Sequence, residues 1–278
     1  MGSAVGDALA RGGVRVVATL EGRSERTARL AARADIELLP DLASVVRDAD
    51  VVLSIAPPEA AVAVAEGALA AARDEGVTPL YADLNAIASE TALALDARAT
   101  EAGIEMVDGS ISGGPPWKPG TRFYLSGPRA REVAALPFDG VDRIVVGDRV
   151  GAASAVKMST ASVYKGSTAL LAHALLAAHA NGVLEHVLAD LQTAAPQLVA
   201  NVERRLAVAA TKSERFVGEM HEIAASQAAA GLTPALFEAI AEIYEALAET
   251  PLAHESPEDV PNEPALADVL DGLRRTSG

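Results

Sequence analysis

The sequence changes its pattern near Gly147, and this change constrains the fold more than any other feature. Before Gly147, short apolar runs rich in β-branched residues alternate with segments of helical periodicity. After it, helical segments follow one another and no pattern indicates a further strand. Alternating strands and helices are typical of an α/β domain with a parallel sheet. The sequence therefore predicts an α/β domain over residues 1–147 and an all-helical domain over residues 148–278.

The composition excludes several classes of protein. Half of the 278 residues are hydrophobic, and the formal net charge of −15 argues against a nucleic-acid-binding surface. The chain has no cysteine, so disulfides, a thiol nucleophile and a thiolate metal site are excluded. No H-x-x-x-H pair or carboxylate cluster indicates a metal site, so we expect none. No apolar run reaches the roughly 20 residues of a membrane span, and the first residues lack a secretion signal, so we expect no membrane partner and a cytoplasmic protein.

The first residues are typical of the helix that follows a dinucleotide-binding turn. Residues 1–13 have helical character and end at a Gly-Gly pair, and a buried parallel strand is expected over residues 14–20. In a doubly wound domain the fingerprint G-x-G-x-x-G places its third glycine in the first turn of this helix. Gly2 matches that third glycine. We therefore expect a doubly wound, Rossmann-type nucleotide-binding domain that lacks its first strand.

The segment after residues 14–20 favours a particular cofactor. In doubly wound domains an acidic residue at this place binds the ribose 2′-hydroxyl of NAD, whereas arginine accommodates the 2′-phosphate of NADP. Here the chain carries Arg23 and Ser24, which can donate hydrogen bonds to phosphate. These residues favour NADP. The competing interpretation is that Arg23 is an ordinary solvated loop residue.

The absence of a first strand has consequences of its own. The first strand of a doubly wound sheet is central, and its end carries the two glycines that approach the pyrophosphate. We therefore expect these elements upstream of Met1, and we expect the strands at residues 14–20 and 51–55 to flank an empty position in the sheet. A chain in this form should bind NADPH poorly.

Two further turns lie at the expected carboxyl edge of the sheet. Pro57 and Pro58 follow the strand at residues 50–55 and would give the nicotinamide a rigid wall, although a plain strand-to-helix turn explains them equally well. Asn85 follows the strand expected at residues 79–84 and is a candidate cofactor ligand. Ligands of open α/β sheets bind at this edge.

The segment from Asp108 to Pro116 is expected to be a loop rich in hydroxyl groups and glycines. Ser112 offers a hydroxyl group, and Gly113 and Gly114 offer consecutive N–H donors to an anion or a carbonyl oxygen. This pattern on its own has little specificity. It predicts a substrate-binding turn when it follows a strand at the carboxyl edge of the sheet.

Lysine is rare in this chain, and two lysines lie on the long helix expected after Gly147. Only four of the 23 basic residues are lysines, and Lys157 and Lys165 are eight residues apart. A lysine amine can give up its proton, whereas a guanidinium cannot, so a titratable amine is indicated. The competing interpretation is that both side chains reach solvent from an amphipathic helix.

Together and in this order, the motifs resemble the β-hydroxyacid dehydrogenase superfamily, which includes 6-phosphogluconate and 3-hydroxyisobutyrate dehydrogenases. Met1-Gly2 resembles the end of its dinucleotide fingerprint, and residues 108–114 resemble its Asp-x-x-x-Ser-Gly-Gly motif. Residues 151–157 resemble its Gly-x-x-x-x-x-Lys helix. Residues 215–223 are most similar to the subgroup with a phosphogluconate-dehydrogenase-like C-terminal domain of unknown function.

The resemblance implies an NADP-dependent oxidoreductase that transfers hydride between the nicotinamide and a small hydroxyl, carbonyl or imine substrate at the domain cleft. It implies that Lys157 is the general acid/base, and that Ser112, Gly113 and Gly114 hold the substrate. The chain departs from the family at one position, because Ala161 stands where the family usually carries a substrate-binding asparagine.

This departure leaves two questions open. Tyr164, Lys165 or Asn85 could supply the missing polar contact, or the protein could be a nucleotide-binding module without catalytic activity. A homodimer is also expected, because the apolar residues around Leu170 and Leu175 offer the helical domain more apolar surface than it can readily bury alone.

Overall fold

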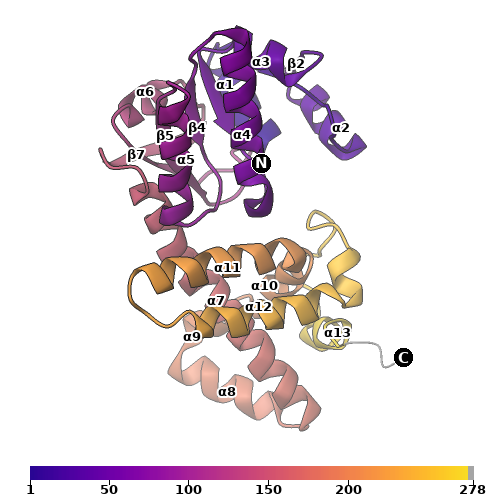
Figure 1. The fold of residues 1–278 in the computed structure, drawn as a ribbon. Coiled ribbons are helices and arrows are strands. Elements are labelled where there is room, and N and C mark those ends of the chain that lie inside the picture. The colour runs from indigo at the N-terminus through magenta and orange to yellow at the C-terminus, as the bar shows by residue number, and fades with distance from the viewer. Residues whose placement is uncertain (275–278) are drawn as a thin grey trace. The chain divides into compact units, whose positions relative to one another are not determined.

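The computed structural model describes residues 1–274, and the chain divides into two compact units. The first unit, Met1–Met158, contains the strands, and the described residues of the second unit, Ser159–Gly278, form helices and turns. This confirms an α/β domain followed by an all-helical one (Figure 1). The division falls inside helix α7 (Ala152–Ala180), whereas the sequence placed the boundary at Gly147, just before this helix.

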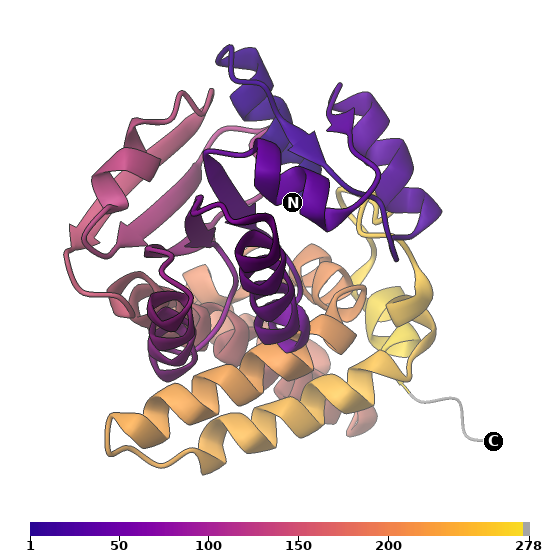
Figure 2. The same ribbon diagram turned by 45° about the horizontal axis from the view of Figure 1, so that its top comes forward.

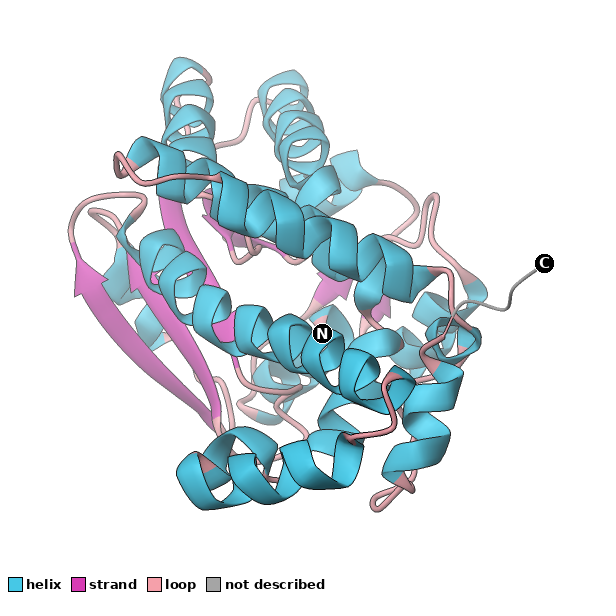
Figure 3. Ribbon diagram, turned by 90° about the horizontal axis from the view of Figure 1, so that it is seen from below, coloured by secondary structure: helices cyan, strands magenta, loops and turns pink. Residues whose placement is uncertain are grey.

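The first unit is built on a five-stranded sheet, shown in magenta in Figure 3. Its strands lie in the order of the chain: β3 (Val51–Ser54), β4 (Leu80–Asp83), β5 (Met106–Ser112), β6 (Thr121–Ser126) and β7 (Val141–Gly147). Neighbouring strands are parallel except β5 and β6, which are antiparallel. Helix α3 (Leu42–Asp48) precedes β3, and the helices that connect strands of this sheet are α4 (Pro58–Glu75), α5 (Ser89–Glu101) and α6 (Ala130–Ala135).

Both faces of this sheet are covered by apolar side chains. Because successive strand residues point to opposite faces, Leu80 and Ala82 join one core cluster and Tyr81 joins another. The first cluster includes Val5 and Leu9 of helix α1 (Gly2–Arg11). The second is filled by the small side chains of α4 and α5. This arrangement of helices on both faces of a mostly parallel sheet is the Rossmann-like architecture expected from the sequence.

A separate two-stranded sheet lies beside α1 and α2 (Glu25–Arg33) in the chain. Strand β1 (Val17–Ala18) pairs in parallel with β2 (Glu37–Leu38), and among the described residues no ladder joins β1 to β3. The sequence predicts that these two strands flank an empty position in one sheet, and the structure has them in two separate sheets. The buried strand expected over residues 14–20 is wrong in length, since only two half-buried residues form it. A strand with a neighbour on one side makes only half of the possible ladder, which explains the shortening.

The second unit is a bundle of helices. Besides the rest of α7, it contains α8 (Leu184–Ala194), α9 (Pro196–Val199), α10 (Val202–Ala210), α11 (Ser213–Ala229), α12 (Ala235–Ala248), the 3₁₀ helix η1 (Pro251–His254) and α13 (Leu266–Gly272). Helices α11 and α12 lie side by side (Figure 2). Tyr244 is fully buried between them and packs edge-on against Phe216, with ring centroids 5.2 Å apart.

The end of the described chain is better packed than its composition indicates. The acidic, proline-rich residues after Ala253 predict at most one short and weakly docked helix. One short helix, α13, does form, but its Leu270 is fully buried. The apolar side chains of α13, rather than its charged ones, decide how it packs. None of the described helices is long and apolar enough to span a membrane.

Candidate functional site

Strand β5 organises the candidate site, and it is longer than the sequence indicated. Residues Asp108 to Ser112, expected to begin a loop, are the last five of the seven residues of β5 and pair antiparallel with β6. A side chain at Gly109 would collide with Leu84, with only 2.3 Å between the added Cβ and Leu84 Cδ2. Glycine therefore allows the strand to continue at this point. The loop prediction was wrong because the partner strand β6 follows later in the sequence.

The turn after β5 contains the predicted substrate-binding glycines. Gly113 adopts a φ of +93°, and a Cβ at this position would lie 2.6 Å from the carbonyl oxygen of Gly120. Only glycine fits such a position without strain. Gly114 is exposed, and its carbonyl accepts a 2.7 Å hydrogen bond from the Thr121 hydroxyl. The turn is thus fixed next to Ser112, which is half-buried at the end of β5.

Lys157 reaches the same end of β5 from the first turns of α7. Its Nζ donates a hydrogen bond to the carbonyl oxygen of Ile111 at 2.7 Å. Because Ile111 directly precedes Ser112, the amine lies beside the residues that the motif assigns to substrate. The structure thus brings Lys157 and the Ser112 turn together, although they are 45 residues apart in the sequence (157 − 112).

Helix α7 begins at a buried carboxylate. Asp108 Oδ2 accepts hydrogen bonds from the backbone N–H groups of Gly151, Ala153 and Ser154 at 2.9, 3.0 and 3.1 Å. The hydroxyl groups of Ser126 and Ser154 also donate to Asp108, at 2.8 and 2.6 Å. A carboxylate at a helix N-terminus accepts hydrogen bonds from N–H groups that have no partner within the helix. Its negative charge also interacts favourably with the helix dipole. The sequence places Asp108 in a motif but gives no sign of this role.

Asn85 lies at the end of β4 and is taken up by hydrogen bonds within the protein. Its Nδ2 donates to Ser54 Oγ at 3.0 Å and to Asp83 Oδ2 at 2.8 Å, and its Oδ1 accepts from Ala56 N at 2.6 Å. Asn85 therefore fixes the turn after β3, which leads into Pro57. A direct contact of Asn85 with a cofactor stays a prediction.

Asp83 is the charged centre of this small network and was missed from the sequence. It is fully buried, and burial raises the pKa of its carboxyl to about 7, with the nearby charge of Asp108 adding to the effect. Hydrogen bonds from Asn85 oppose the rise but do not cancel it. An acidic residue at the end of an otherwise apolar strand was the available signal, since such residues are rarely buried without partners.

The predicted cofactor residues in α1 and the turn after β3 lie close to one another. Gly2 is the first residue of α1, and a Cβ at Gly2 would lie 3.9 Å from Ile55 Cβ, directly after β3. The helix has no side-chain cap and no acidic residue in its first turn. Pro57 is the N-cap of α4 and Pro58 its first residue. An uncapped helix N-terminus beside a turn of this kind is suited to an anionic group.

Arg23 and Ser24 lie in the turn between β1 and α2. Both are exposed, and Ser24 is the N-cap of α2, where its Oγ accepts from Thr27 N at 3.3 Å. Arg23 lies five residues beyond the end of β1 at Ala18 (23 − 18), because the strand is shorter than expected. Its contact with a 2′-phosphate stays a prediction.

Lys165 and Tyr164 differ sharply in their surroundings. Lys165 Nζ forms an ion pair with Glu219, a carboxylate that is only 4% exposed, and lies 4.4 Å from the centre of the Phe216 ring. Tyr164 is 66% exposed. The sequence could have indicated the ion pair, because Glu219 lies in the apolar stripe of Phe216, Met220 and Ile223 and would need a partner there.

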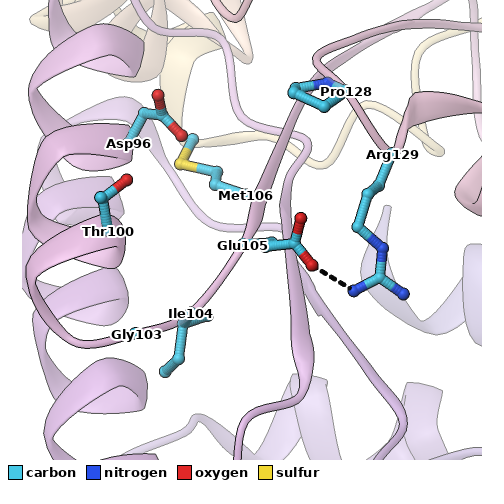
Figure 4. Close-up of a pocket in the computed structure, with 8 residues that line it drawn as sticks. All are labelled: Asp96, Thr100, Gly103, Ile104, Glu105, Met106, Pro128 and Arg129. Carbon is cyan, nitrogen blue, oxygen red and sulfur yellow. Dashed lines mark hydrogen bonds and ion pairs between the residues drawn. The ribbon is translucent and has the colours of Figure 1, made fainter.

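A surface pocket of about 330 Å³ lies at the other end of β5 (Figure 4). It is lined by residues such as Asp96, Glu105 and Arg129, and Arg129 donates to Glu105 at 2.9 Å. Burial raises the pKa of the Asp96 carboxyl. The pocket is next to Met106, at the start of the strand that ends at Ser112, so it is separate from the candidate site.

Comparisons with known proteins agree with this arrangement. Residues 1–136 match the NAD binding domain of 6-phosphogluconate dehydrogenase, and residues 178–247 match a domain of unknown function, DUF1932. One solved structure is 30% identical, with a TM-score of 0.65 over 88% of this chain and 92% of that chain. It is a conserved protein of unknown function described as structurally similar to 3-hydroxyacid dehydrogenases. The chain belongs to the 6-phosphogluconate dehydrogenase-like family.

Two further members of this structural group cover nearly the whole chain. A conserved hypothetical protein from Sinorhizobium meliloti is 28% identical, with a TM-score of 0.66 over 98% of this chain and 93% of that chain. The 3-hydroxyisobutyrate dehydrogenase of Mycobacterium tuberculosis, solved with L-serine, is 22% identical, with a TM-score of 0.67 over 99% of this chain and 96% of that chain. The chain therefore shares its fold with these proteins over nearly its whole length.

Proposed function

We propose that this protein is an NADP-dependent oxidoreductase that transfers hydride between the nicotinamide and a small hydroxyl or carbonyl substrate. The observation that carries the proposal is the position of the Lys157 amine, 2.7 Å from the carbonyl oxygen of Ile111 and thus beside Ser112. An amine that can gain and lose a proton lies next to hydroxyl and N–H donors suited to a small polar substrate. An imine substrate would accept the same proton on nitrogen.

Lys157 acts as the general acid/base in this proposal. In the direction of reduction, Nζ leaves the carbonyl of Ile111 and donates a proton to the oxygen that becomes a hydroxyl group. In the direction of oxidation, the neutral amine takes this proton back. The hydroxyl group of Ser112 and the N–H groups of Gly113 and Gly114 orient the substrate. General acid–base catalysis by a positioned side chain contributes roughly 10²–10⁴-fold to a rate.

The residues that would hold the cofactor come from the start of α1, the turn after β3 and the turn after β1. The uncapped N-terminus of α1 at Gly2 suits the pyrophosphate, and Pro57 and Pro58 provide a wall without N–H donors. Arg23, exposed after β1, would pair with the 2′-phosphate, and Ser24 would donate to it. The nicotinamide, when bound, supplies or accepts the hydride.

Tyr164, Lys165 and Asn85 are the candidates for the polar contact that the asparagine usually provides. Ala161 is 4% exposed and offers no polar group at the position of that asparagine. The side-chain amide of Asn85 already donates hydrogen bonds to Ser54 and Asp83, and Lys165 forms an ion pair with Glu219. Tyr164 is the member of this set whose side chain is largely exposed.

Replacing Lys157 tests the proposal. The activity assay follows the absorbance of NADPH with a panel of small hydroxyacids, aldehydes and imines. With a substrate found in this way, Lys157→Met should lower kcat by about 10²–10⁴-fold while NADPH still binds. Lys118→Met, which removes an exposed lysine from a loop, is the matched control and should keep full activity. Unchanged turnover in Lys157→Met would falsify the assigned role.

A nucleotide-binding module without catalytic activity is the second candidate, and Ala161 is the observation that favours it. In that case NADPH would bind and no substrate of the panel would change its absorbance. Measuring NADPH binding and the absorbance of NADPH with the substrate panel therefore separates the two functions before any variant is made.

We also propose that the second unit forms a homodimer. Leu171 and Leu175 are 5% and 0% exposed and belong to the protein's own core. Leu170, which the sequence also indicated, is 68% exposed, and Val163 on the same helix is 65% exposed. They are seven residues apart and share one face of the helix. Light scattering at micromolar concentration should give the mass of a dimer, and Leu170→Glu should shift it toward the monomer.

A further inference from the structure

The carboxylate of Asp108 holds the start of α7 from a distant strand. Asp108 is 1% exposed, and its oxygens accept three backbone and two hydroxyl hydrogen bonds, four of them from α7 or the residue before it and one from Ser126. Helix α7 has no acidic residue of its own in the first turn. Asp108 thus supplies the negative charge that a helix N-terminus favours.

The same strand holds α7 at two further places. Ser110 Oγ donates to the carbonyl oxygen of Ala153 at 2.9 Å, and the carbonyl of Ile111 accepts from Lys157. Asp108, Ser110 and Ser112 are two residues apart from one another and therefore share one face of β5. The residue that orients substrate and the residues that hold the lysine helix are consequently parts of one strand.

We infer that Asp108 is a positioning residue for Lys157, an inference that rests on the function proposed above. By capping α7, Asp108 fixes where the helix begins and therefore where Nζ lies relative to Ser112. Lys157 is six residues beyond Gly151, about 9 Å along the helix axis, so a change at the helix start is carried directly to the amine. Proton transfer requires hydrogen-bond distance, and a shift of about 1 Å is costly.

The test uses Asp108→Asn and two measurements that do not depend on each other. The asparagine keeps the size of the side chain but turns an amide NH₂ toward groups that are themselves donors, so hydrogen bonds to α7 are lost. The first measurement is the rate at which an amine-acetylating reagent modifies each lysine, followed by peptide mass spectrometry. The second is the effect on kcat and KM.

We expect the acetylation rate of Lys157 to rise about tenfold in Asp108→Asn, since hydrogen bonds to a charged group are lost. The rates of Lys118, Lys165 and Lys212 should stay within about twofold. Once a substrate is known, kcat of Asp108→Asn should be at least tenfold lower than that of wild type, while KM and NADPH affinity change little. A general loosening of the fold would instead raise the rates of the half-buried Lys165 and Lys212 together with that of Lys157, and this outcome overturns the inference.

Milder variants keep the test decisive if Asp108→Asn does not fold. The double variant Ser126→Ala/Ser154→Ala leaves the carboxylate and its three backbone donors and removes both hydroxyl donors. It should raise the Lys157 rate about two- to threefold. Ser162→Ala is the matched control, since the Ser162 hydroxyl bonds only within α7, to Ser159 O at 2.7 Å. No change at Lys157 in the folded double variant contradicts the inference.

The two proposals fail in different ways. If wild type binds NADPH and no substrate reacts, the proposed function fails, while the acetylation rates still show whether Asp108 positions Lys157. In the opposite case, Lys157→Met abolishes turnover while Asp108→Asn changes neither kcat nor the acetylation rate of Lys157. That result supports the proposed function and refutes the positioning role of Asp108.

Discussion

The two sheets of the first unit are held together in different ways. Strands β3 to β7 form a continuous sheet between two apolar clusters, and its polar groups at Asp83, Asn85 and Asp108 are buried in hydrogen-bond networks. The β1–β2 pair has two residues in each strand, and exposed ion pairs lie beside it. Ser112, proposed to orient the substrate, belongs to the first sheet, and the Lys157 amine donates to a carbonyl of the same strand, whereas Arg23 follows the second sheet.

This difference between the five-stranded sheet and the β1–β2 pair matches the role proposed for the residues next to each. A proton donor must stay within hydrogen-bond distance of the reacting atom, which requires a rigid support. A guanidinium that pairs with a phosphate acts through charge and tolerates more movement. Local stability in proteins varies in this way, with low values where few apolar contacts are buried. The predictions below test whether the two sheets differ as much as their contacts indicate.

Core truncation should separate the two sheets most strongly. Phe123 is fully buried in β6 and packs edge-on against Phe138, with ring centroids 5.1 Å apart. Phe123→Ala should lower the free energy of unfolding by about 3–5 kcal/mol. Ile36→Ala, a half-buried residue next to β2, should cost only about 1 kcal/mol. Urea unfolding measures both, and equal losses would show that the small sheet is as firmly packed as the large one.

The buried carboxyl of Asp83 predicts a pH dependence that the small sheet lacks. Its pKa is raised to about 7, so between about pH 4 and pH 7 the folded state keeps a proton that the unfolded chain has released. Stability should therefore fall as the pH rises through this window, by up to about 1.4 kcal/mol per pH unit. Thermal melts at pH 5.5 and 8 measure the change, and Asp83→Asn should remove it.

Asp41 provides the control for this prediction. Hydrogen bonds from Ser44 lower the pKa of the Asp41 carboxyl, which caps α3. Its contribution to stability is present above its ordinary pKa and is lost only as the pH falls below about 4. Asp41→Asn should therefore leave the change between pH 5.5 and 8 intact. If this change persists in Asp83→Asn, another group causes it.

Cofactor preference should depend on Arg23 alone among the nearby arginines. A hydrogen bond to a charged group is worth about 1.5–3 kcal/mol, so NADPH should bind roughly ten- to a hundredfold more tightly than NADH. Arg23→Ala should remove this preference by weakening NADPH binding and not NADH binding. Arg29→Ala, from the exposed face of α2, should keep it. Fluorescence titration of wild type and the two variants gives three ratios of NADPH to NADH affinity, and similar affinities of wild type for both cofactors would count against NADP.

The elements of the fold could largely be predicted because each has its own local pattern. The strands near residues 51–55 and 79–84, and the long helix after Gly147, follow from periodicity and turn residues. The length of β1 and the extension of β5 could not be predicted. A strand ends where its neighbours end, and those neighbours, β2 and β6, follow later in the chain.

The candidate site shows the same limit at the level of side chains. Lys157 and Ser112 could be found because motif spacing marks them. The hydrogen bond from Lys157 to Ile111 and the capping of α7 by Asp108 involve backbone groups, which every residue carries, so the sequence gives no signal for them. The motif marks Lys157 and not Lys165, but it gives no sign that Lys165 is paired with the buried Glu219.

The smallest expected effect concerns the ion pairs beside the β1–β2 pair. Arg15 donates to both oxygens of Glu37, at 2.7 and 2.8 Å, and to Asp48 at 3.3 Å. The guanidinium lowers the pKa of the Glu37 carboxyl, yet all three side chains are at least 36% exposed. Exposed pairs of this kind contribute little and are screened by salt.

Arg15→Gln should therefore lower the melting temperature slightly at low salt and not at all near 1 M salt, where the Debye length is about 3 Å. Ser126→Ala, which removes a donor from the buried Asp108 network, should lower it equally at both salt concentrations, because buried pairs are screened much less. Differential scanning calorimetry of the two variants at both salt concentrations makes the comparison. A loss in Arg15→Gln that persists at high salt would mean that packing of its aliphatic stem, and not charge, supports the small sheet.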